Sequence, residues 1–388
     1  MEVFNTDSRV LVTCNKRLAP YLINEVEGLG FSIVRSFSTG VELKGTVNDC
    51  IRLNLNLRTG SQVLYSLKKF QAGTPEELYN ELVAIPWEEL IDITGYFSIT
   101  SNVVNEYIRT PLFANVKVKD AIVDRIREKK QVRPDSGPLT NRAVIHLYWH
   151  GDEGEVFIDT SGEVISKHGY RKLPGKAPML EALAAATIMA GRWDRKSAFV
   201  NPMCGSGTLA IEAALLASQK TPGFFRMNYG FMHILGYDEQ VFFAERRKLK
   251  EQAQKHLDFP IIASDISEEA IDIARKNART AGVDHLIKFQ VGDFADTEIP
   301  AAPGVIMFNP EYGERLGVHS KLEGTYKRIG DFLKQECKGY YGYIFTGNPD
   351  LAKKIGLKAA RRIEFYNGKL DCRLLEYELY EGSRREIS

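Results

Sequence analysis

A glycine-rich segment at residues 201–208 separates an apolar strand pattern at 197–200 from a helical pattern at 209–217. Two glycines one residue apart allow a tight turn in which the backbone approaches a ligand without a Cβ clash. A turn between strand and helix is typical of doubly wound α/β sheets, which bind ligands at the carboxyl ends of their strands. We therefore expect a ligand to be contacted by Asn201, Pro202, Met203, Cys204, Gly205, Ser206, Gly207 and Thr208.

The chain after residue 161 alternates between strand and helix patterns. Strands are expected at 261–264, 287–291, 305–308 and 340–345, and a helix at 267–281. Two final strand patterns flank Asn367-Gly368, a sequence typical of a hairpin turn. These patterns predict a doubly wound α/β domain over 161–388 whose last strand is antiparallel, with a helical insertion at 218–259.

The first 160 residues have a different texture. The order strand, helix, strand, strand, helix, strand over 1–68 is that of a ferredoxin-like domain. A second α+β unit is expected over 69–160. It contains a helix at 114–128, and the side chains expected on one side of this helix are Val116, Val118, Ile122, Val123 and Ile126. A chain of 388 residues exceeds what one core usually serves, which agrees with several domains.

Acidic residues follow the next two strands of the C-terminal domain. Asp265 is expected to accept the hydroxyls of a ribose, and Asp293 to accept the exocyclic amine of an adenine. The adjacent residues Ile266 and Phe294 complete this part of the predicted site. Either acid alone is more typical of a helix cap or a turn, but successive strand ends of one sheet favour a shared ligand.

The fourth strand of this domain ends in Asn309-Pro310-Glu311-Tyr312. The Asn309 side-chain oxygen and the Pro310 carbonyl are candidate acceptors for the N–H groups of an exocyclic amine. Such an amine is a poor nucleophile because its lone pair is delocalised into the base. Tyr312 offers a flat face on which an extruded base can stack.

Composition excludes several classes of protein. No apolar stretch approaches the ~20 residues of a membrane span, and the first residues lack the features of a secretory signal. The five cysteines are scattered without a C-x-x-C pair, which argues against a disulfide framework and against a zinc site. We expect a cytoplasmic protein without a metal.

The net charge of +1 does not indicate a partner, but basic residues are locally concentrated. Each basic cluster is either a solvated face or a contact surface for nucleic acid. The clusters are Arg125, Arg127, Lys129, Lys130 and Arg133; Lys167, His168, Arg171, Lys172 and Lys176; and Lys353, Lys354, Lys358, Arg361 and Arg362.

Three longer strings, DTSGEVISKHGYR, PMCGSGTLAIEAA and NPEYGERLG, resemble the THUMP-containing bacterial 23S ribosomal RNA guanine-N2 methyltransferases. These belong to the class I enzymes that use S-adenosyl-L-methionine. The resemblance spans nearly the whole chain. It implies that residues 1–160 bind RNA, either 23S rRNA or a ribosomal precursor, and that 161–388 perform the chemistry. It further implies that Pro178 and Glu181 border the methionine end of the cofactor, and we expect Lys167, Arg171 and Lys172 to contact RNA.

Two positions depart from the pattern of that family, which carries an acid in place of Asn201 and a proline in place of Glu311. The amide keeps an acceptor oxygen without a charge, and Glu311 is expected to face outward. Two alternatives stay open. One is adenine-N6 methylation of nucleic acid, because the same motif serves any exocyclic amine. The other is a non-catalytic RNA-binding or assembly factor that retains the cofactor pocket.

Overall fold

The computed structural model describes residues 2–106, 110–173, 179–312 and 319–380, without the side chains of 319–321. The chain divides into two compact units. The first contains Met1–Asn15, Leu22–Ser166 and Arg226–Leu249, and the second contains Lys16–Tyr21, Lys167–Phe225 and Lys250–Ser388. The chain therefore returns to the first unit after it has entered the second.

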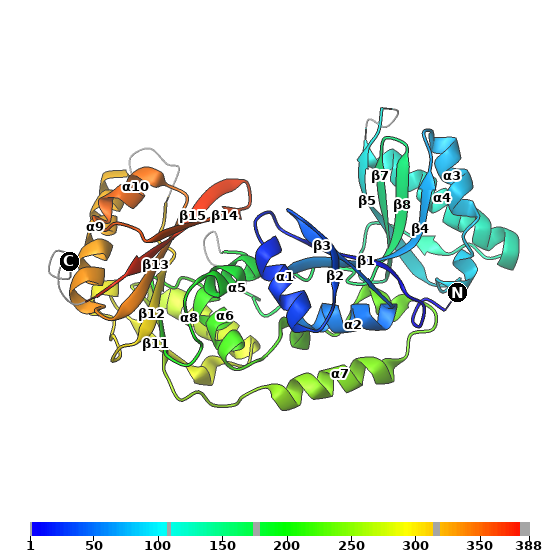
Figure 1. The fold of residues 1–388 in the computed structure, drawn as a ribbon. Helices are drawn as coiled ribbons and strands as arrows, with labels where there is room; N and C mark the ends of the chain where they lie inside the picture. The colour runs from blue at the N-terminus through cyan, green and yellow to red at the C-terminus, as the bar shows by residue number, and fades with distance from the viewer. Residues whose placement is uncertain (1, 107–109, 174–178, 313–318, 381–388) are drawn as a thin grey trace. The chain divides into compact units, whose positions relative to one another are not determined.

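One eight-stranded sheet runs through the whole first unit, in the order β2-β3-β1-β4-β8-β7-β5-β6 (Figure 1). The long strand β4 joins its two halves, because it pairs antiparallel with both β1 and β8. The ferredoxin-like strands and the strands that follow them thus form a single sheet. The strands are β1 (Ser8–Cys14), β2 (Ile33–Phe37), β3 (Gly40–Gly45), β4 (Gly60–Gln71), β5 (Tyr96–Val104), β6 (Asp135–Ser136), β7 (Ala143–His150) and β8 (Glu153–Asp159).

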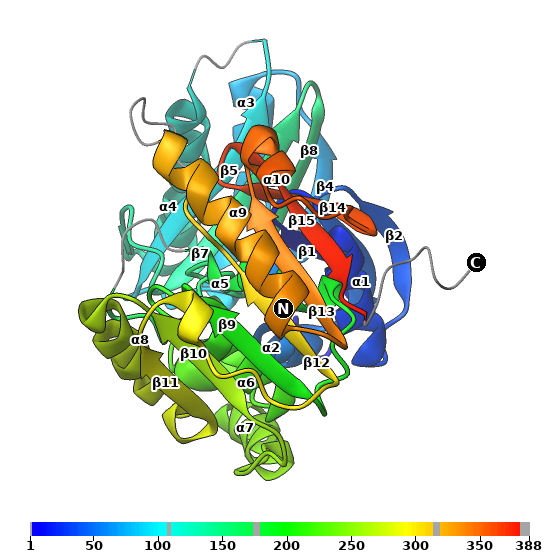
Figure 2. The same ribbon diagram turned by 90° about the vertical axis from the view of Figure 1, so that its left-hand side faces the viewer.

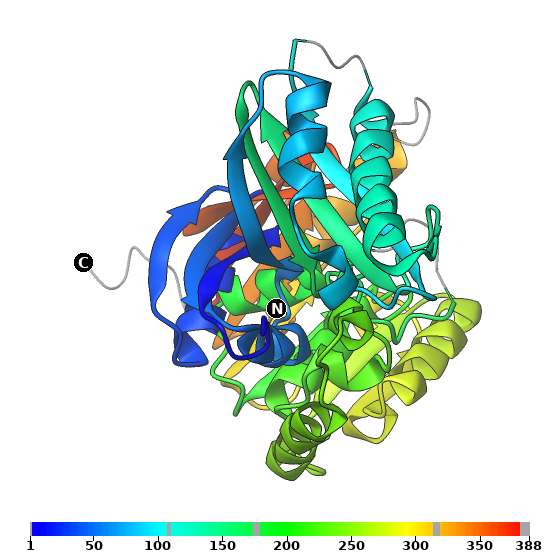
Figure 3. The same cartoon turned by 90° about the vertical axis from the view of Figure 1, so that its right-hand side faces the viewer.

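The first 166 residues also contribute four α-helices: α1 (Ala19–Gly28), α2 (Val47–Asn56), α3 (Pro75–Val83) and α4 (Pro111–Lys130). Thr74 and Glu77 form a capping box that fixes the start of α3. Helices α3 and α4 pack side by side (Figure 3). The buried side of α4 contains Val118, Ile122 and Ile126 as predicted, but Val116 is 47% exposed, so its assignment to the buried side was wrong.

Part of the predicted helical insertion packs within the first unit. Its 3₁₀ helix η3 (Gly230–His233) and most of α7 (Glu239–Gln252) lie in the returning segment. The Phe231 N–H donates to the Thr160 carbonyl at 3.1 Å, and the Leu235 N–H donates to the Leu90 carbonyl at 2.9 Å. A Cβ at Gly230 would lie 2.1 Å from the Asp159 carbonyl oxygen, so this close approach requires glycine.

The second unit is built on a seven-stranded sheet in the order β11-β10-β9-β12-β13-β15-β14. Strands β9 to β13 are parallel, and β15 pairs antiparallel with β13, as predicted. The hairpin turns at Asn367-Gly368, where Gly368 has a φ of +62°. The bounds are β9 (Ala198–Pro202), β10 (Ile261–Asp265), β11 (Ile287–Val291), β12 (Gly304–Phe308), β13 (Tyr340–Thr346), β14 (Arg361–Asn367) and β15 (Leu370–Glu378).

Helices surround this sheet (Figure 2). Helix α6 packs against α5 and α8, and α9 packs against α10. A core of side chains from β9, β10, β12 and β13, including Val200, Ile262, Ile306 and Phe308, packs on Tyr326 and other residues of α9. The bounds are α5 (Glu181–Ala190), α6 (Thr208–Ala217), α8 (Glu268–Thr280), α9 (His319–Glu336) and α10 (Pro349–Lys354). The predicted α/β fold class is confirmed.

Candidate active site

The glycine turn lies between β9 and α6, as predicted. Gly205 and Gly207 have φ angles of +54° and +81°. A Cβ at Gly207 would lie 2.8 Å from the Cβ of Ala274, so glycine lets α6 and α8 pack closely. A Cβ at Gly205 would have no heavy atom within 4 Å, so this side of the turn faces open space. The backbone is thereby available to a ligand at Gly205.

Asp265 ends β10 and lies beside the turn. Its Oδ2 accepts from the Gly205 N–H at 2.9 Å, and its Oδ1 accepts from the Ser267 N–H at 3.0 Å. Ser267 in turn caps α8 by accepting from the Ala270 N–H. Asp265 therefore fixes the glycine turn to the start of α8 and keeps further lone pairs for a ligand. The next side chain, Ile266, is 73% exposed.

Asp293 follows β11 and begins the 3₁₀ helix η5 (Phe294–Asp296). Its Oδ1 accepts from the Ala295 N–H at 2.9 Å and from Arg328 of α9 at 2.8 Å. Burial alone would raise the pKa of Asp293, but these hydrogen bonds together bring it below its usual value. Phe294 is 6% exposed and packs edge-on to Phe308, so its ring belongs to the core. The structure leaves only its backbone for a ligand.

Asn201, at the end of β9, is buried and connects two strands. Its Nδ2 donates to the Met307 carbonyl of β12 at 2.8 Å. Its Oδ1 is buried and finds no hydrogen-bond partner among the described residues. A buried polar atom without a partner in a native fold calls for an explanation, and a ligand is one. Pro202 ends the same strand, and Met203 has a positive φ of +54°.

Three side chains of the turn complete this region. Burial raises the pKa of the Cys204 thiol, and the nearby Asp265 carboxylate raises it further, so the thiol stays protonated. Ser206 Oγ and Thr208 Oγ1 lie 3.4 Å apart. The N-terminus of α6, at Gly207 and Thr208, has no side-chain cap, so its first N–H groups are candidates for an anion.

Asn309, after β12, carries a second orphaned acceptor. Its Oδ1 is buried and finds no hydrogen-bond partner in the part of the chain that the structure describes. Pro310 is buried, and Glu311 is exposed as expected. The half-buried Tyr312 ring is held at both ends: it packs 6.4 Å from the Phe345 ring, and its hydroxyl accepts from Asn367 at 2.9 Å. Motif and strand end thus meet as predicted.

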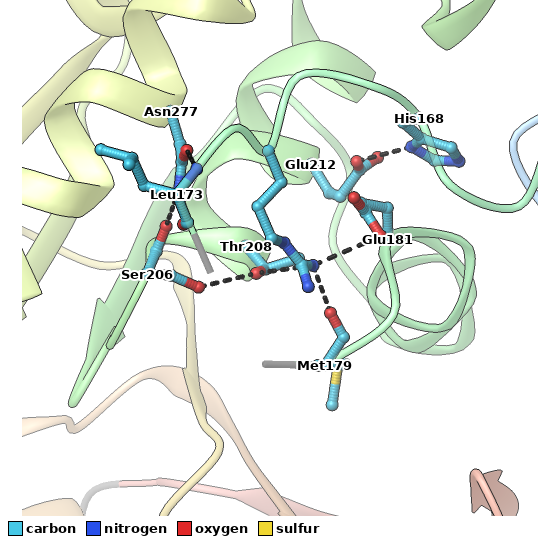
Figure 4. A network of polar contacts seen from close by, with 9 residues as sticks. His168, Leu173, Met179, Glu181, Ser206, Thr208, Glu212 and Asn277 are labelled. Carbon is cyan, nitrogen blue, oxygen red and sulfur yellow. Dashed lines mark hydrogen bonds and ion pairs between the residues drawn. The ribbon is translucent and has the colours of Figure 1, made fainter. Parts of the chain in front are cut away.

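The structure gives Arg171 a different setting from its basic neighbours. Its guanidinium donates to the Met179 carbonyl and, at 3.2 Å, to Thr208 Oγ1, and it lies 3.4 Å from Glu181 Oε2 (Figure 4). The side chain is only 11% exposed. This burial argues against the RNA contact expected for Arg171. Lys167 and Lys172 are exposed, and Pro178 lies outside the described residues.

Three buried polar residues near this network were missed by the sequence analysis. Asn277 of α8 donates to the carbonyls of Leu173 and Ser206 at 3.1 and 3.3 Å, and its Oδ1 accepts from the Leu173 N–H (Figure 4). His168 Nδ1 lies 2.7 Å from Glu212 Oε1, and neither side chain is exposed. A polar residue on the apolar side of a predicted helix, as Glu212 and Asn277 are, was the available signal.

The donor set fits S-adenosylmethionine. An open glycine turn and a carboxylate at the next strand end suit a nucleoside, while an arginine and a glutamate suit an amino acid. Within the described ranges, no group of three or more His, Cys, Asp or Glu side chains could hold a metal ion. No helix in those ranges is both long enough and apolar enough to cross a membrane.

A parallel sheet with an antiparallel hairpin, a glycine turn, two strand-end acids and an Asn-Pro-x-Tyr motif define a class I methyltransferase. The sequence matches the RMKL-like methyltransferase domain over residues 168–376, the RlmL ferredoxin-like domain over 9–64 and the THUMP domain over 72–159. The chain belongs to the RMKL-like methyltransferase family.

Related proteins cover the whole chain. The Ribosomal RNA large subunit methyltransferase K/L of Syntrophotalea carbinolica is 35% identical over 384 residues, which are 96% of this chain and 54% of that protein. The chain thus spans about half the length of that relative. A methyltransferase candidate crystallised with SAH is 28% identical with a TM-score of 0.87, covering 98% and 100% of the two chains. A Listeria monocytogenes protein, predicted to be an N6-adenine-specific DNA methylase, is 30% identical with a TM-score of 0.85, covering 96% and 97%.

Proposed function

We propose that this protein transfers a methyl group from S-adenosylmethionine to the exocyclic N2 of a guanine in 23S ribosomal RNA. The relatives named as large-subunit ribosomal RNA methyltransferases and the THUMP domain support an RNA substrate. Residues of the first unit bind the RNA, and the second unit performs the transfer. A ribosomal substrate places the protein in the cytoplasm.

The sulfonium of S-adenosylmethionine supplies the methyl group as an electrophile. Gly205 and Asp265 hold the nucleoside part, with the Asp265 carboxylate accepting from the ribose, and Asp293 accepts from the adenine amine. Asn309 Oδ1 and the Pro310 carbonyl accept the two N–H bonds of the guanine amine. These acceptors draw the lone pair of the nitrogen out of conjugation and orient it for in-line attack. The Tyr312 ring stacks on the extruded base.

The observation that carries this proposal is the buried Asn309 Oδ1 without a partner among the described residues. An unmade hydrogen bond of this kind costs roughly 1–3 kcal/mol, so it persists where function needs it. It lies two residues beyond a strand of the same sheet that presents Asp265 and three before the half-buried Tyr312 ring. An amine donor next to a methyl donor satisfies this acceptor.

The test is methyl transfer from labelled S-adenosylmethionine to ribosomal RNA from cells that lack this protein. Replacing Asn309 by alanine is expected to reduce kcat by about 10²–10³-fold, the usual loss for one aligned hydrogen-bonding group. SAH affinity should stay at the wild-type value. Glu311→Gln is the matched control, because Glu311 is exposed and its loss should leave the rate intact. A wild-type rate in the Asn309→Ala protein would contradict the proposal.

Adenine-N6 methylation is the second candidate, supported by the predicted activity of the Listeria protein. Digestion of the labelled nucleic acid separates the two: N2-methylguanosine supports the proposal, and N6-methyladenosine supports the alternative. A protein that binds RNA and SAH but never transfers a methyl group would instead be a binding or assembly factor. Each outcome is read from the same wild-type assay.

A further inference from the structure

Arg171 is the one basic residue of its cluster that the structure buries among polar partners. Lys167 and Lys172 on either side of it are exposed. The three groups around its guanidinium come from three places in the chain: the Met179 carbonyl, Glu181 at the start of α5 and Thr208 at the start of α6. These positions border the glycine turn. The guanidinium therefore lies in the second unit's interior, beside the region that the nucleoside part of a cofactor would occupy.

The ion pair of Arg171 with Glu181 is loose. Their closest nitrogen and oxygen are 3.4 Å apart, whereas charge-assisted hydrogen bonds are usually about 2.7–2.9 Å long. Arg171 Nε is buried and has no hydrogen-bond partner among the residues described. Glu181 is 5% exposed. Each charge of the pair thus retains bonding capacity, which a buried pair rarely does without a ligand.

We infer that Arg171 and Glu181 bind the amino-acid end of S-adenosylmethionine, Arg171 its carboxylate and Glu181 its ammonium. This inference rests on the proposed function. The amino-acid end is a zwitterion, and a fixed cation next to a fixed anion complements it. The planar guanidinium can bind a carboxylate through two parallel N–H bonds. The uncapped start of α6 adds N–H groups to the carboxylate side.

Buried contacts hold the segment that carries Arg171 at both of its ends. Before it, His168 pairs with Glu212 of α6 at 2.7 Å, with both side chains fully buried. After it, the Leu173 backbone makes two hydrogen bonds to Asn277 of α8. A segment tied to two helices presents a preformed cation, so binding does not have to order a long side chain. Such support is expected of a binding residue and is superfluous for a solvated one.

The test compares two ligands, SAH and decarboxylated SAH, which lacks only the carboxylate. Calorimetry on the full chain should show that wild-type protein binds decarboxylated SAH about 10–100-fold more weakly, the range for a charged hydrogen bond. Arg171→Ala should lose a similar factor for SAH and little for the decarboxylated ligand. Glu181→Gln should weaken both ligands, because both retain the ammonium.

Matched controls separate this role from a structural one. Lys172→Ala changes the adjacent exposed cation and should bind both ligands like the wild type. Arg171→Lys keeps the charge and should retain part of the preference for SAH, even if the alanine variant folds poorly. The salt dependence of RNA binding should be the same in Arg171→Ala and wild type.

Three results would overturn the assignment: an equal loss for both ligands in Arg171→Ala and Arg171→Lys, no loss in either variant, or a reduced salt slope for RNA. Failure of the proposed function looks different, because the wild-type protein would then bind neither ligand. The ratio of the two affinities thus reports on Arg171 alone.

Discussion

The Gly205 N–H donates a 2.9 Å hydrogen bond to Asp265 Oδ2, which ties the glycine turn after β9 to the end of β10. The other oxygen of the same carboxylate accepts from the Ser267 N–H. Both oxygens are thus occupied by backbone donors on one side. The acid that is expected to bind the ribose also sets the shape of the turn that the ribose would approach.

We expect Asp265→Asn to weaken SAH binding, because one backbone N–H would then face an amide NH₂ group. The loss of charge and of one acceptor should reduce the affinity by about 10–100-fold in calorimetry. Asp272→Asn, an exposed position on the following helix α8, is the control and should bind normally. Equal affinities of the two variants would reject the ribose assignment.

Asn201 gives a prediction against the simple expectation that restoring the acid of the family should help. An aspartate there would lose the hydrogen bond to the Met307 carbonyl and place two acceptors face to face at about 2.8 Å. We expect Asn201→Asp to reduce the free energy of unfolding of the second unit by roughly 1–3 kcal/mol at pH 8. Protonation restores a donor, so the loss should shrink as the pH falls.

Urea unfolding at pH 5 and pH 8 measures this effect. Asn348→Asp is the matched control, because the Asn348 side-chain oxygen accepts from the Asp350 and Leu351 N–H groups at a helix start, where a carboxylate is tolerated. If Asn201→Asp were as stable as this control at pH 8, the Asn201 amide would not be needed as a donor to Met307.

Motifs that follow strands were predictable from the sequence. Gly205, Asp265 and Asn309 each lie at the end of an apolar run, and the parallel order of these runs brings them to one edge of the sheet. Local chemistry sufficed: glycines mark the turn, and polar residues follow buried strands. The same reasoning located the Asn367-Gly368 hairpin, because its turn type is written in two residues.

Contacts between distant residues were not predictable. Arg171 resembles its exposed lysine neighbours in sequence, and its burial depends on residues such as Asn277, which holds the adjacent Leu173 from 104 positions away. The assignment of residues 226–249 to the first unit depends on hydrogen bonds to Thr160 and Leu90. No periodicity or spacing contains such information, so it enters only with the folded chain.

Tyr312 separates stacking from acid–base chemistry. Burial raises the pKa of Tyr312 to about 12, so its phenol is expected to stay neutral throughout the assay range. Between about pH 7 and pH 10, kcat/KM should therefore have the same pH profile in wild type and Tyr312→Phe. Tyr312→Ala removes the ring and should weaken RNA binding by roughly 10–100-fold, the range for one stacked base. A pH step lost in Tyr312→Phe would instead assign the hydroxyl a proton.

Asp159 offers a prediction for the first unit that does not depend on catalysis. Its carboxylate is fully buried and accepts from Gln62 at 2.6 Å and from the Ser161 and Gly162 N–H groups. Burial nevertheless raises its pKa to about 6. The unfolded chain has an ordinary aspartate, near pKa ~3.9. Because the folded pKa is the higher one, the folded state binds the proton more tightly, and stability falls as the pH rises from about 4 to about 6.

Asp159→Asn should remove this dependence. Its Oδ1 can accept from the two backbone N–H groups while Gln62 rotates to present its oxygen to the new Nδ2. Relative to wild type, the variant should therefore gain roughly 3 kcal/mol in unfolding free energy between pH 4 and pH 7.5, from ~1.4 kcal/mol per unit. In a Trp193→Phe background, the two remaining tryptophans, Trp87 and Trp149, both report on the first unit. Asp152→Asn, an exposed site beyond β7, is the control. Parallel pH profiles of wild type and Asp159→Asn would mean that the buried carboxylate is already neutralised by other means.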